Sequence, residues 1–121
     1  MKTLLRAIII EDNEDDVIFL IRHLSRIGYE VREVVVSDLS SFSDALSSHR
    51  ADVIFCDSNV PGLPTEKALE LCRSDSPEIP VVVVSGDISS VLESMKSYAT
   101  KLVSKDRLSD LDVALAEVLG N

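Results

Sequence analysis

Short runs of β-branched and other apolar residues alternate along the chain with longer segments in which apolar residues recur every three or four positions. The short runs predict strands at residues 7–10, 31–36, 52–56, 80–84 and 101–103. The longer segments predict amphipathic helices, with apolar stripes within residues 17–24, 39–46, 68–72, 88–95 and 108–118. The order of elements is therefore strand and helix in strict alternation, five times.

The first, third and fourth of these strands are apolar almost throughout, which is typical of strands covered on both faces of a parallel sheet. The second begins with charged residues, Glu30, Arg32 and Glu33, as an edge strand does. Alternation with right-handed connections predicts an α/β fold, a (βα)5 doubly wound parallel sheet in three layers. The 121 residues are expected to form a single domain, residues 1–121.

The formal net charge of −9 disfavours a direct nucleic-acid partner, because phosphate binding needs clustered lysines and arginines and the twelve here are scattered. No apolar stretch approaches the roughly 20 residues that span a bilayer, and Arg6 and Glu11 interrupt the apolar start before a signal-peptide cleavage site. We therefore expect a cytoplasmic protein. Cys56 and Cys72 lie in apolar segments without a metal-binding spacing, which predicts reduced core thiols.

Polar residues whose side chains could react or bind a ligand stand where the predicted strands end. Glu11 and Asp12 follow the first strand, Asp57 the third and Ser85 the fourth, while Lys105 lies just beyond the fifth. In doubly wound sheets the ligand site lies at the carboxyl ends of the strands, so these side chains are expected to meet. Two carboxylates about 5 Å apart repel by roughly 3 kcal/mol at an effective dielectric constant of 20. Either a cation or solvent must relieve that repulsion.

The strand-end motifs resemble those of the receiver domain of two-component response regulators, over the whole chain and in the same order. The matching segments are IIIEDN at residues 8–13, VIFCDSNVPG at 53–62, VVVVSG at 81–86 and LVSK at 102–105. The resemblance implies a flavodoxin-like, CheY-like fold with strand order 2-1-3-4-5. It also implies a signalling domain that assists its own phosphorylation and dephosphorylation and turns over no separate metabolite.

By this resemblance Asp57 is the phosphoacceptor, and Mg2+ is the cofactor. Asp12, Asp57 and the backbone carbonyl of Asn59 would bind the ion directly, and Glu11 would act through a coordinated water, since Mg2+ prefers an octahedron of oxygens and keeps several waters. A carboxylate whose charge is partly offset by a metal can attack the phosphorus of a phosphohistidine or a small phosphodonor in line.

The resemblance also implies that Lys105 neutralises charge on the phosphoryl group and that Ser85 donates a hydrogen bond to it. A sensor histidine kinase or phosphotransfer protein would supply the phosphoryl group. A downstream protein, or a covalently linked output or sensor domain, would read the surface of the fourth helix, fifth strand and fifth helix. No nucleic acid or membrane is expected as a direct partner, and a phosphorylation-linked homodimer is plausible.

The sequence departs from the family pattern near the fifth strand. Leu102 stands where an aromatic residue commonly swings inward on activation, and Asp106 stands where proline usually follows the lysine. Asp106 is expected to cap the last helix, near Leu108. The missing aromatic leaves open a receiver-like adaptor that acts without phosphorylation. A phosphatase of the haloacid dehalogenase type is disfavoured, because Asn59 occupies the position of its general acid.

The remaining polar residues have simpler explanations. Glu14, Asp15 and Asp16 fall in the first turn of a predicted helix, where acidic side chains interact favourably with the helix dipole and need no ligand. His23 and His49 lie on the polar faces of predicted helices, which predicts surface histidines.

Overall fold

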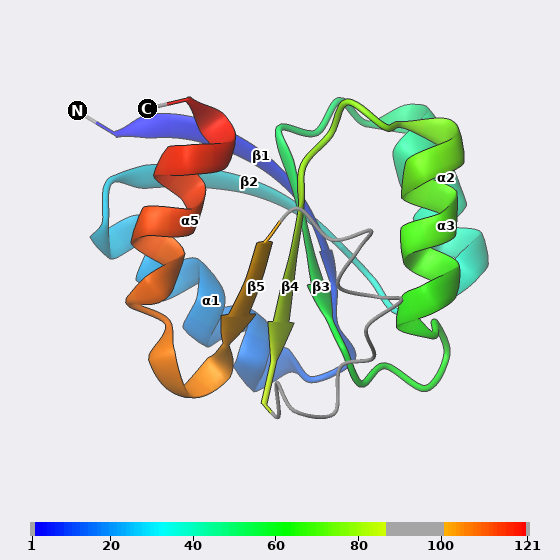
Figure 1. The fold of residues 1–121 in the computed structure, drawn as a ribbon, viewed down its shortest axis with the longest axis horizontal. Coiled ribbons are helices and arrows are strands. Elements are labelled where there is room, and N and C mark those ends of the chain that lie inside the picture. Colours follow the sequence, from blue (N-terminus) through cyan, green and yellow to red (C-terminus); the bar gives the residue numbers. More distant parts are fainter. Residues whose placement is uncertain (1, 87–100, 121) are drawn as a thin grey trace.

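The computed structural model of the chain describes residues 2–86 and 101–120 and shows a central parallel sheet between two layers of helices (Figure 1). The strands are β1 (Thr3–Ile10), β2 (Tyr29–Val36), β3 (Val53–Asp57), β4 (Val81–Ser85) and β5 (Lys101–Ser104). The helices are α1 (Glu14–Arg26), α2 (Leu39–Ser48), α3 (Thr65–Asp75), a 3-10 turn (Lys105–Arg107) and α5 (Asp110–Leu119). The helix expected around residues 88–95 lies outside the described residues. None of the helices in the described part is both long and apolar enough to cross a membrane.

The strand order is β2-β1-β3-β4-β5, and every neighbouring pair is parallel. This arrangement confirms the predicted α/β fold and its 2-1-3-4-5 order. It also confirms β2 as an edge strand. The charged residues Glu30, Arg32 and Glu33 of β2 are therefore placed where only one side of the strand is paired and their side chains stay exposed.

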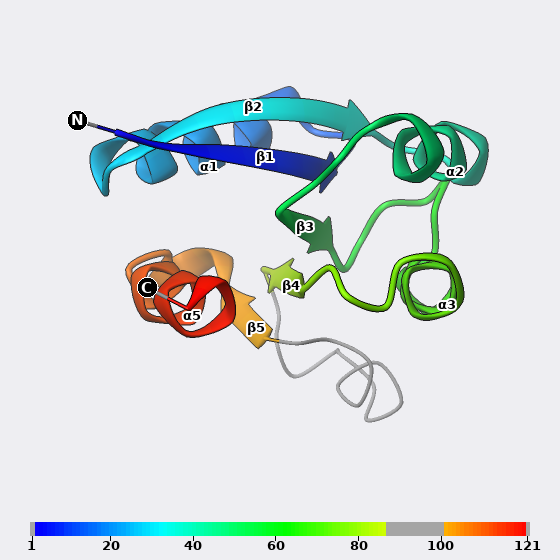
Figure 2. The same ribbon diagram turned by 90° about the horizontal axis from the view of Figure 1, so that it is seen from above.

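Successive side chains of the inner strands point to opposite faces of the sheet and pack into two separate apolar cores, one on each face. On β1, Ile8 and Ile10 pack in the core beneath α2 and α3, whereas Ala7 and Ile9 pack in the core beneath α1 and α5. Figure 2 shows the same division, with α1 and α5 on one face and α2 and α3 on the other. Where both faces are covered, at residues 7–10, 53–56 and 81–84, these strands are continuous apolar runs, as the sequence indicated.

The two cysteines confirm their predicted role as core thiols. Cys56 is fully buried and Cys72 is 4% exposed, and both are free. Burial raises the pKa of each thiol to about 12, which keeps them protonated and unreactive at neutral pH.

Strands β1 and β2 start earlier than predicted, at Thr3 and Tyr29, and pair over eight residues. Their first halves are buried on one face only: Leu5 is 2% exposed, while its neighbours Leu4 and Arg6 are exposed. Alternation of this kind, with a charge inside it, is a weaker signal than a continuous apolar run. The prediction therefore began at residue 7 in β1, where the strand becomes fully buried, and at residue 31 in β2.

The loop that follows β3 packs closely against the end of β2. A Cβ atom at Gly62 would lie 2.6 Å from the backbone carbonyl oxygen of Ser37, a distance that only glycine permits without a shift of the loop. This close approach holds the β3–α3 loop beside the carboxyl edge of the sheet, where the candidate site lies.

Candidate functional site

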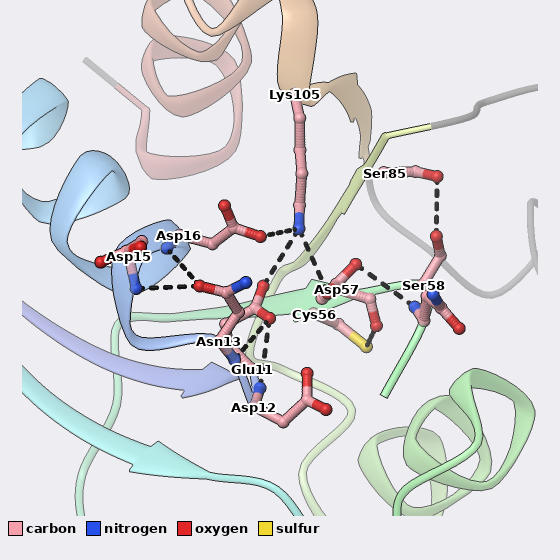
Figure 3. A network of polar contacts seen from close by, with 11 residues as sticks. Glu11, Asp12, Asn13, Asp15, Asp16, Cys56, Asp57, Ser58, Ser85 and Lys105 are labelled. Atoms are coloured by element: carbon pink, nitrogen blue, oxygen red, sulfur yellow. Dashed lines mark hydrogen bonds and ion pairs between the residues drawn. The ribbon is translucent and has the colours of Figure 1, made fainter. Parts of the chain in front are cut away.

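The predicted site residues gather at the carboxyl edge of the sheet. Glu11 directly follows β1, Asp57 is the last residue of β3, Ser85 the last of β4, and Lys105 the first residue after β5. Glu11, Asp57 and Ser85 are 7%, 6% and 1% exposed, so their polar groups have little access to water. Figure 3 shows the side chain of Lys105 pointing toward the carboxylates of Glu11 and Asp57.

Three carboxylates form a candidate divalent-cation site. One oxygen each from Glu11, Asp12 and Asp57 lies within 4.8 Å of the others. Asp12 is exposed, and the other two are buried. At such a separation each pair of negative charges repels by about 3 kcal/mol at an effective dielectric constant of 20. An all-oxygen donor set with one solvent-facing side suits Mg2+, which binds through few carboxylates and retains waters.

Within this cluster, burial and the neighbouring carboxylate shift the pKa of Glu11. The pKa of Glu11 is raised to about 7, first by burial and then by the hydrogen bond and negative charge of Asp57, against the opposing effects of the Asn13 backbone N–H and Lys105. Oε1 of Glu11 accepts hydrogen bonds from the backbone N–H groups of Asp12 and Asn13, each at 3.1 Å. These bonds fix the side chain, so Glu11 cannot relieve the repulsion by turning into solvent.

Lys105 lies among three carboxylates. Its Nζ atom is 3.2 Å from Oε2 of Glu11, 3.2 Å from Oδ2 of Asp57 and 2.6 Å from Oδ2 of Asp16. Burial alone would lower the pKa of Lys105, but the hydrogen bond to Asp16 and the charges of Asp57 and Glu11 raise it above its ordinary value. The ammonium therefore stays charged at neutral pH and offsets part of the negative charge.

The role predicted for Asp16 was incomplete. Glu14 and Asp15 are exposed in the first turn of α1, which fits their interpretation as helix-dipole residues. Asp16 lies in the same turn but makes the shortest contact of Lys105. The N-cap Asn13 accepts hydrogen bonds from the backbone N–H groups of Asp15 and Asp16, at 2.9 and 3.2 Å, and so fixes the turn from which Asp16 projects.

Asn59 and Ser85 occupy the rim around Asp57. The backbone N–H of Asn59 donates to Oδ1 of Asp57 at 3.2 Å, which ties the loop after β3 to the predicted phosphoacceptor. Oγ of Ser58 donates to Oγ of Ser85 at 2.7 Å, a partner that sequence reasoning missed because a single serine in a loop has no distinctive signal. A cleft of about 520 Å³ opens above these groups, and it is lined by Glu11, Asp12, Asn13, Asp16, Asp57, Ser58, Asn59, Pro61, Ser85, Gly86 and Lys105.

The surface position predicted for His23 is wrong, whereas His49 is exposed as expected. The side chain of His23 is only 14% exposed, and its Nε2 atom lies 2.7 Å from Oδ1 of Asp112 on α5. This contact joins α1 to α5 on one face of the sheet.

The predicted cap of the last helix is also wrong. Helix α5 begins at Asp110, two residues later than expected, and its N-cap position is taken by Ser109. Asp106 instead belongs to the 3-10 turn, where its backbone N–H donates to Oγ of Ser104 at 3.2 Å. The turn covers Lys105–Arg107, just after β5 and before the residues that the sequence pattern assigned to the helix.

Comparison with known proteins gives one family match. The family model described as the response regulator receiver domain matches residues 7–116. Among curated proteins, a sequence search finds no match.

Solved structures with the same fold include several receiver domains. The receiver domain of the sensor histidine kinase PA1611 from Pseudomonas aeruginosa PAO1, with a magnesium ion in its active-site cleft, is similar with a TM-score of 0.81 and 19% identity, covering 97% of this chain and 98% of that one. The response regulator TrrA from Thermotoga maritima, in complex with Mg2+ and BeF, has a TM-score of 0.82 and 17% identity, covering 98% and 100%. Full-length FixJ from B. japonicum has a TM-score of 0.75 and 23% identity. The match covers 97% of this chain and 60% of FixJ.

Proposed function

This chain belongs to the response regulator receiver domain family, and from that premise we propose that it accepts a phosphoryl group on Asp57 as part of a two-component phosphorelay. The observation that carries the proposal is the position of Asp57: a buried carboxylate at the end of β3, next to two other carboxylates and 3.2 Å from the ammonium of Lys105. Buried clusters of perturbed titratable groups are typical of reactive sites.

The proposed reaction transfers the phosphoryl group from a phosphohistidine to Asp57. A carboxylate oxygen of Asp57 attacks the phosphorus in line, the bond from phosphorus to the imidazole nitrogen breaks, and the imidazole leaves with a proton from solvent. Lys105 offsets negative charge on the phosphoryl oxygens, and Ser85 donates a hydrogen bond to one of them. The product is an acyl phosphate on Asp57.

The residues at the site fit Mg2+ as the cofactor of this reaction. Asp12, Asp57 and the carbonyl of Asn59 would bind it directly, and Glu11 would bind through water. The raised pKa of Glu11 supports this assignment, because burial first and Asp57 second disfavour the charged form of Glu11, and a bound cation would offset that cost. When bound, Mg2+ supplies positive charge that offsets the carboxylates and the incoming phosphoryl group.

Incubation with Mg2+ and acetyl phosphate or phosphoramidate tests the proposal. The expected result is a mass increase of one phosphoryl group that Asp57→Asn abolishes and that hydroxylamine reverses, as it does for acyl phosphates. Asp44→Asn is the matched control, because Asp44 is an exposed carboxylate on α2, and this variant should label like the wild type. Labelling that persists in Asp57→Asn would refute Asp57 as the acceptor.

A second candidate function is a receiver-like adaptor that its partner binds whether or not Asp57 is modified. Leu102 favours it, because this side chain is partly buried against the core beneath α2 and α3 and takes the place of the aromatic switch. The absence of labelling by all donors, together with unchanged partner binding by Asp57→Asn, would support the adaptor. Steady release of phosphate from an unrelated monoester would instead support the disfavoured phosphatase.

The wider biological setting is part of the same proposal. Residues 1–121 would act as one receiver domain in the cytoplasm, phosphorylated by a sensor histidine kinase or a phosphotransfer protein. A downstream protein, a linked output or sensor domain, or a second copy of the chain would read the surface of β5, α5 and residues 87–100, a segment outside the described residues. FixJ, which is longer than this chain, supports the possibility of a linked domain.

A further inference from the structure

Lys105 is bound more closely by Asp16 than by either carboxylate of the proposed reaction site. The Nζ atom lies 2.6 Å from Asp16, against 3.2 Å from Glu11 and 3.2 Å from Asp57 (Figure 3). Asp16 is not among the predicted metal ligands, and the transfer of a phosphoryl group to Asp57 does not require it. Its contact with Lys105 therefore needs an explanation of its own.

Lys105 has no N–H donor to spare beyond its three contacts with carboxylates. A lysine ammonium has three N–H donors, and three carboxylate oxygens occupy them in this structure. Phosphorylation takes one oxygen of Asp57 into the new bond to phosphorus and adds three charged phosphoryl oxygens. The acceptors near Lys105 would then outnumber its donors, so Lys105 can bind a phosphoryl oxygen fully only if one of the present contacts is released or shared.

Differences in burial decide which contact is released. The side chain of Glu11 is 6% exposed, so its carboxylate would lose its partner in a place that water hardly reaches. Asp57, 7% exposed, carries the phosphoryl group that Lys105 would bind. The side chain of Asp16 is 35% exposed, and water can replace Lys105 there. The shortest contact is therefore also the one that is easiest to give up.

We propose that Asp16 is a positioning residue that holds Lys105 while Asp57 is unmodified and competes with the phosphoryl group for it. This inference rests on the proposed phosphorylation of Asp57 and extends it to a residue on α1. Release of Asp16 on phosphorylation frees the first turn of α1 from the segment after β5. The modification state of Asp57 is thereby transmitted to α1.

Helix α1 offers a matched control for the charge of Asp16. Asp15 lies in the same turn, and Asn13 accepts the backbone N–H groups of both residues. The variants Asp15→Asn and Asp16→Asn therefore remove the same charge from the same helix terminus, with the same loss of interaction with the helix dipole. Only Asp16→Asn weakens a contact with Lys105.

Binding of beryllofluoride, a phosphoryl mimic, in excess Mg2+ tests the competition. Asp16→Asn should bind beryllofluoride about fivefold more tightly than the wild type, as expected for removal of one partly exposed ion pair. Asp15→Asn should bind like the wild type, and Asp16→Glu, which keeps the charge and the acceptor, should restore wild-type affinity. Equal affinity of Asp16→Asn and Asp15→Asn, or weaker binding by Asp16→Asn, would overturn the proposal.

A second measurement separates this inference from the function on which it rests. In metal-free buffer, the amine of Lys105 should react faster with a small acylating reagent in Asp16→Asn than in Asp15→Asn, as measured by peptide mass spectrometry. If the wild type does not bind beryllofluoride while this difference is present, the proposed phosphorylation of Asp57 is refuted and the contact between Asp16 and Lys105 is supported. If the wild type binds beryllofluoride and Lys105 reacts equally in both variants, the role of Asp16 in holding Lys105 is refuted and the proposed phosphorylation is supported.

Discussion

In metal-free protein, the carboxyl group of Glu11 should make the fold less stable as the pH rises. The pKa of Glu11 is raised from 4.5 to about 7 in the folded protein, first by burial and then by Asp57. Between these two values the folded state binds more protons than the unfolded chain. The stabilisation is therefore fully present below pH 4.5 and is lost as the pH rises through about 7.

The size of this loss follows from the shift. At about 1.36 kcal/mol per pKa unit, a shift of about 2.5 units corresponds to roughly 3 kcal/mol, of which about 2 kcal/mol falls between about pH 5.5 and pH 8. Because the Glu11 side chain is only 6% exposed, solvent screening reduces this figure little. The loss is a large fraction of the stability of an ordinary domain.

Urea unfolding followed by circular dichroism measures the loss, with a chelator present and the pH varied. The wild type should lose about 2 kcal/mol more than Glu11→Gln across this range, because glutamine does not titrate. Glu70→Gln, which removes an exposed carboxylate from α3, should behave like the wild type. Parallel pH profiles for the wild type and Glu11→Gln, or a wild type that gains stability with pH, would refute the role assigned to Glu11.

Three further outcomes are expected. Mg2+ should raise the Tm of the wild type and Asp12→Asn should lose most of that gain, measured by thermal unfolding; an unchanged response in the variant would count against the metal site. Gly62→Ala should lower stability by about 1–3 kcal/mol, because its Cβ would meet the Ser37 carbonyl at 2.6 Å, and a wild-type urea midpoint would show that the loop moves freely. A double-mutant cycle of His23→Gln and Asp112→Asn should give a coupling of at most about 1 kcal/mol, since Asp112 is 46% exposed, and additive effects would mean that the pair contributes nothing.

Sequence reasoning predicted the fold because two independent signals agreed on it. Inner strands covered on both faces are continuous apolar runs, and the helices show a 3.6-residue period, so topology followed from their alternation. The strand ends Glu11, Asp57, Ser85 and Lys105 were found for the same reason, since a parallel sheet brings its carboxyl ends to one edge whatever the side chains are. Half-buried strand starts, at Thr3 and Tyr29, carry only a weak alternating signal and were missed.

The contacts of Asp16 and His23 were missed for a different reason. Each residue pairs with a partner 89 positions away, Lys105 and Asp112 respectively, and no local pattern marks either pair. Each also had a sufficient local explanation: a helix dipole for Asp16 and a polar helix face for His23. Which helical residues meet across a layer depends on the rotation of the helix over the sheet, and that rotation is set by packing of the whole core rather than by neighbouring residues.

These two contacts together explain how α1 can respond to the site without losing its place in the fold. Asp16 and His23 are seven residues apart, which is two helical turns, so they lie on the same face of α1 about 10 Å apart. Leu20 and Leu24, between and beyond them, are buried in the core that α1 shares with α5. Transfer of Lys105 to a phosphoryl group would break only the contact of Asp16, while His23 and the leucines still hold the rest of the helix. The change should therefore be confined to the first turn of α1, next to the cleft that a phosphodonor must enter.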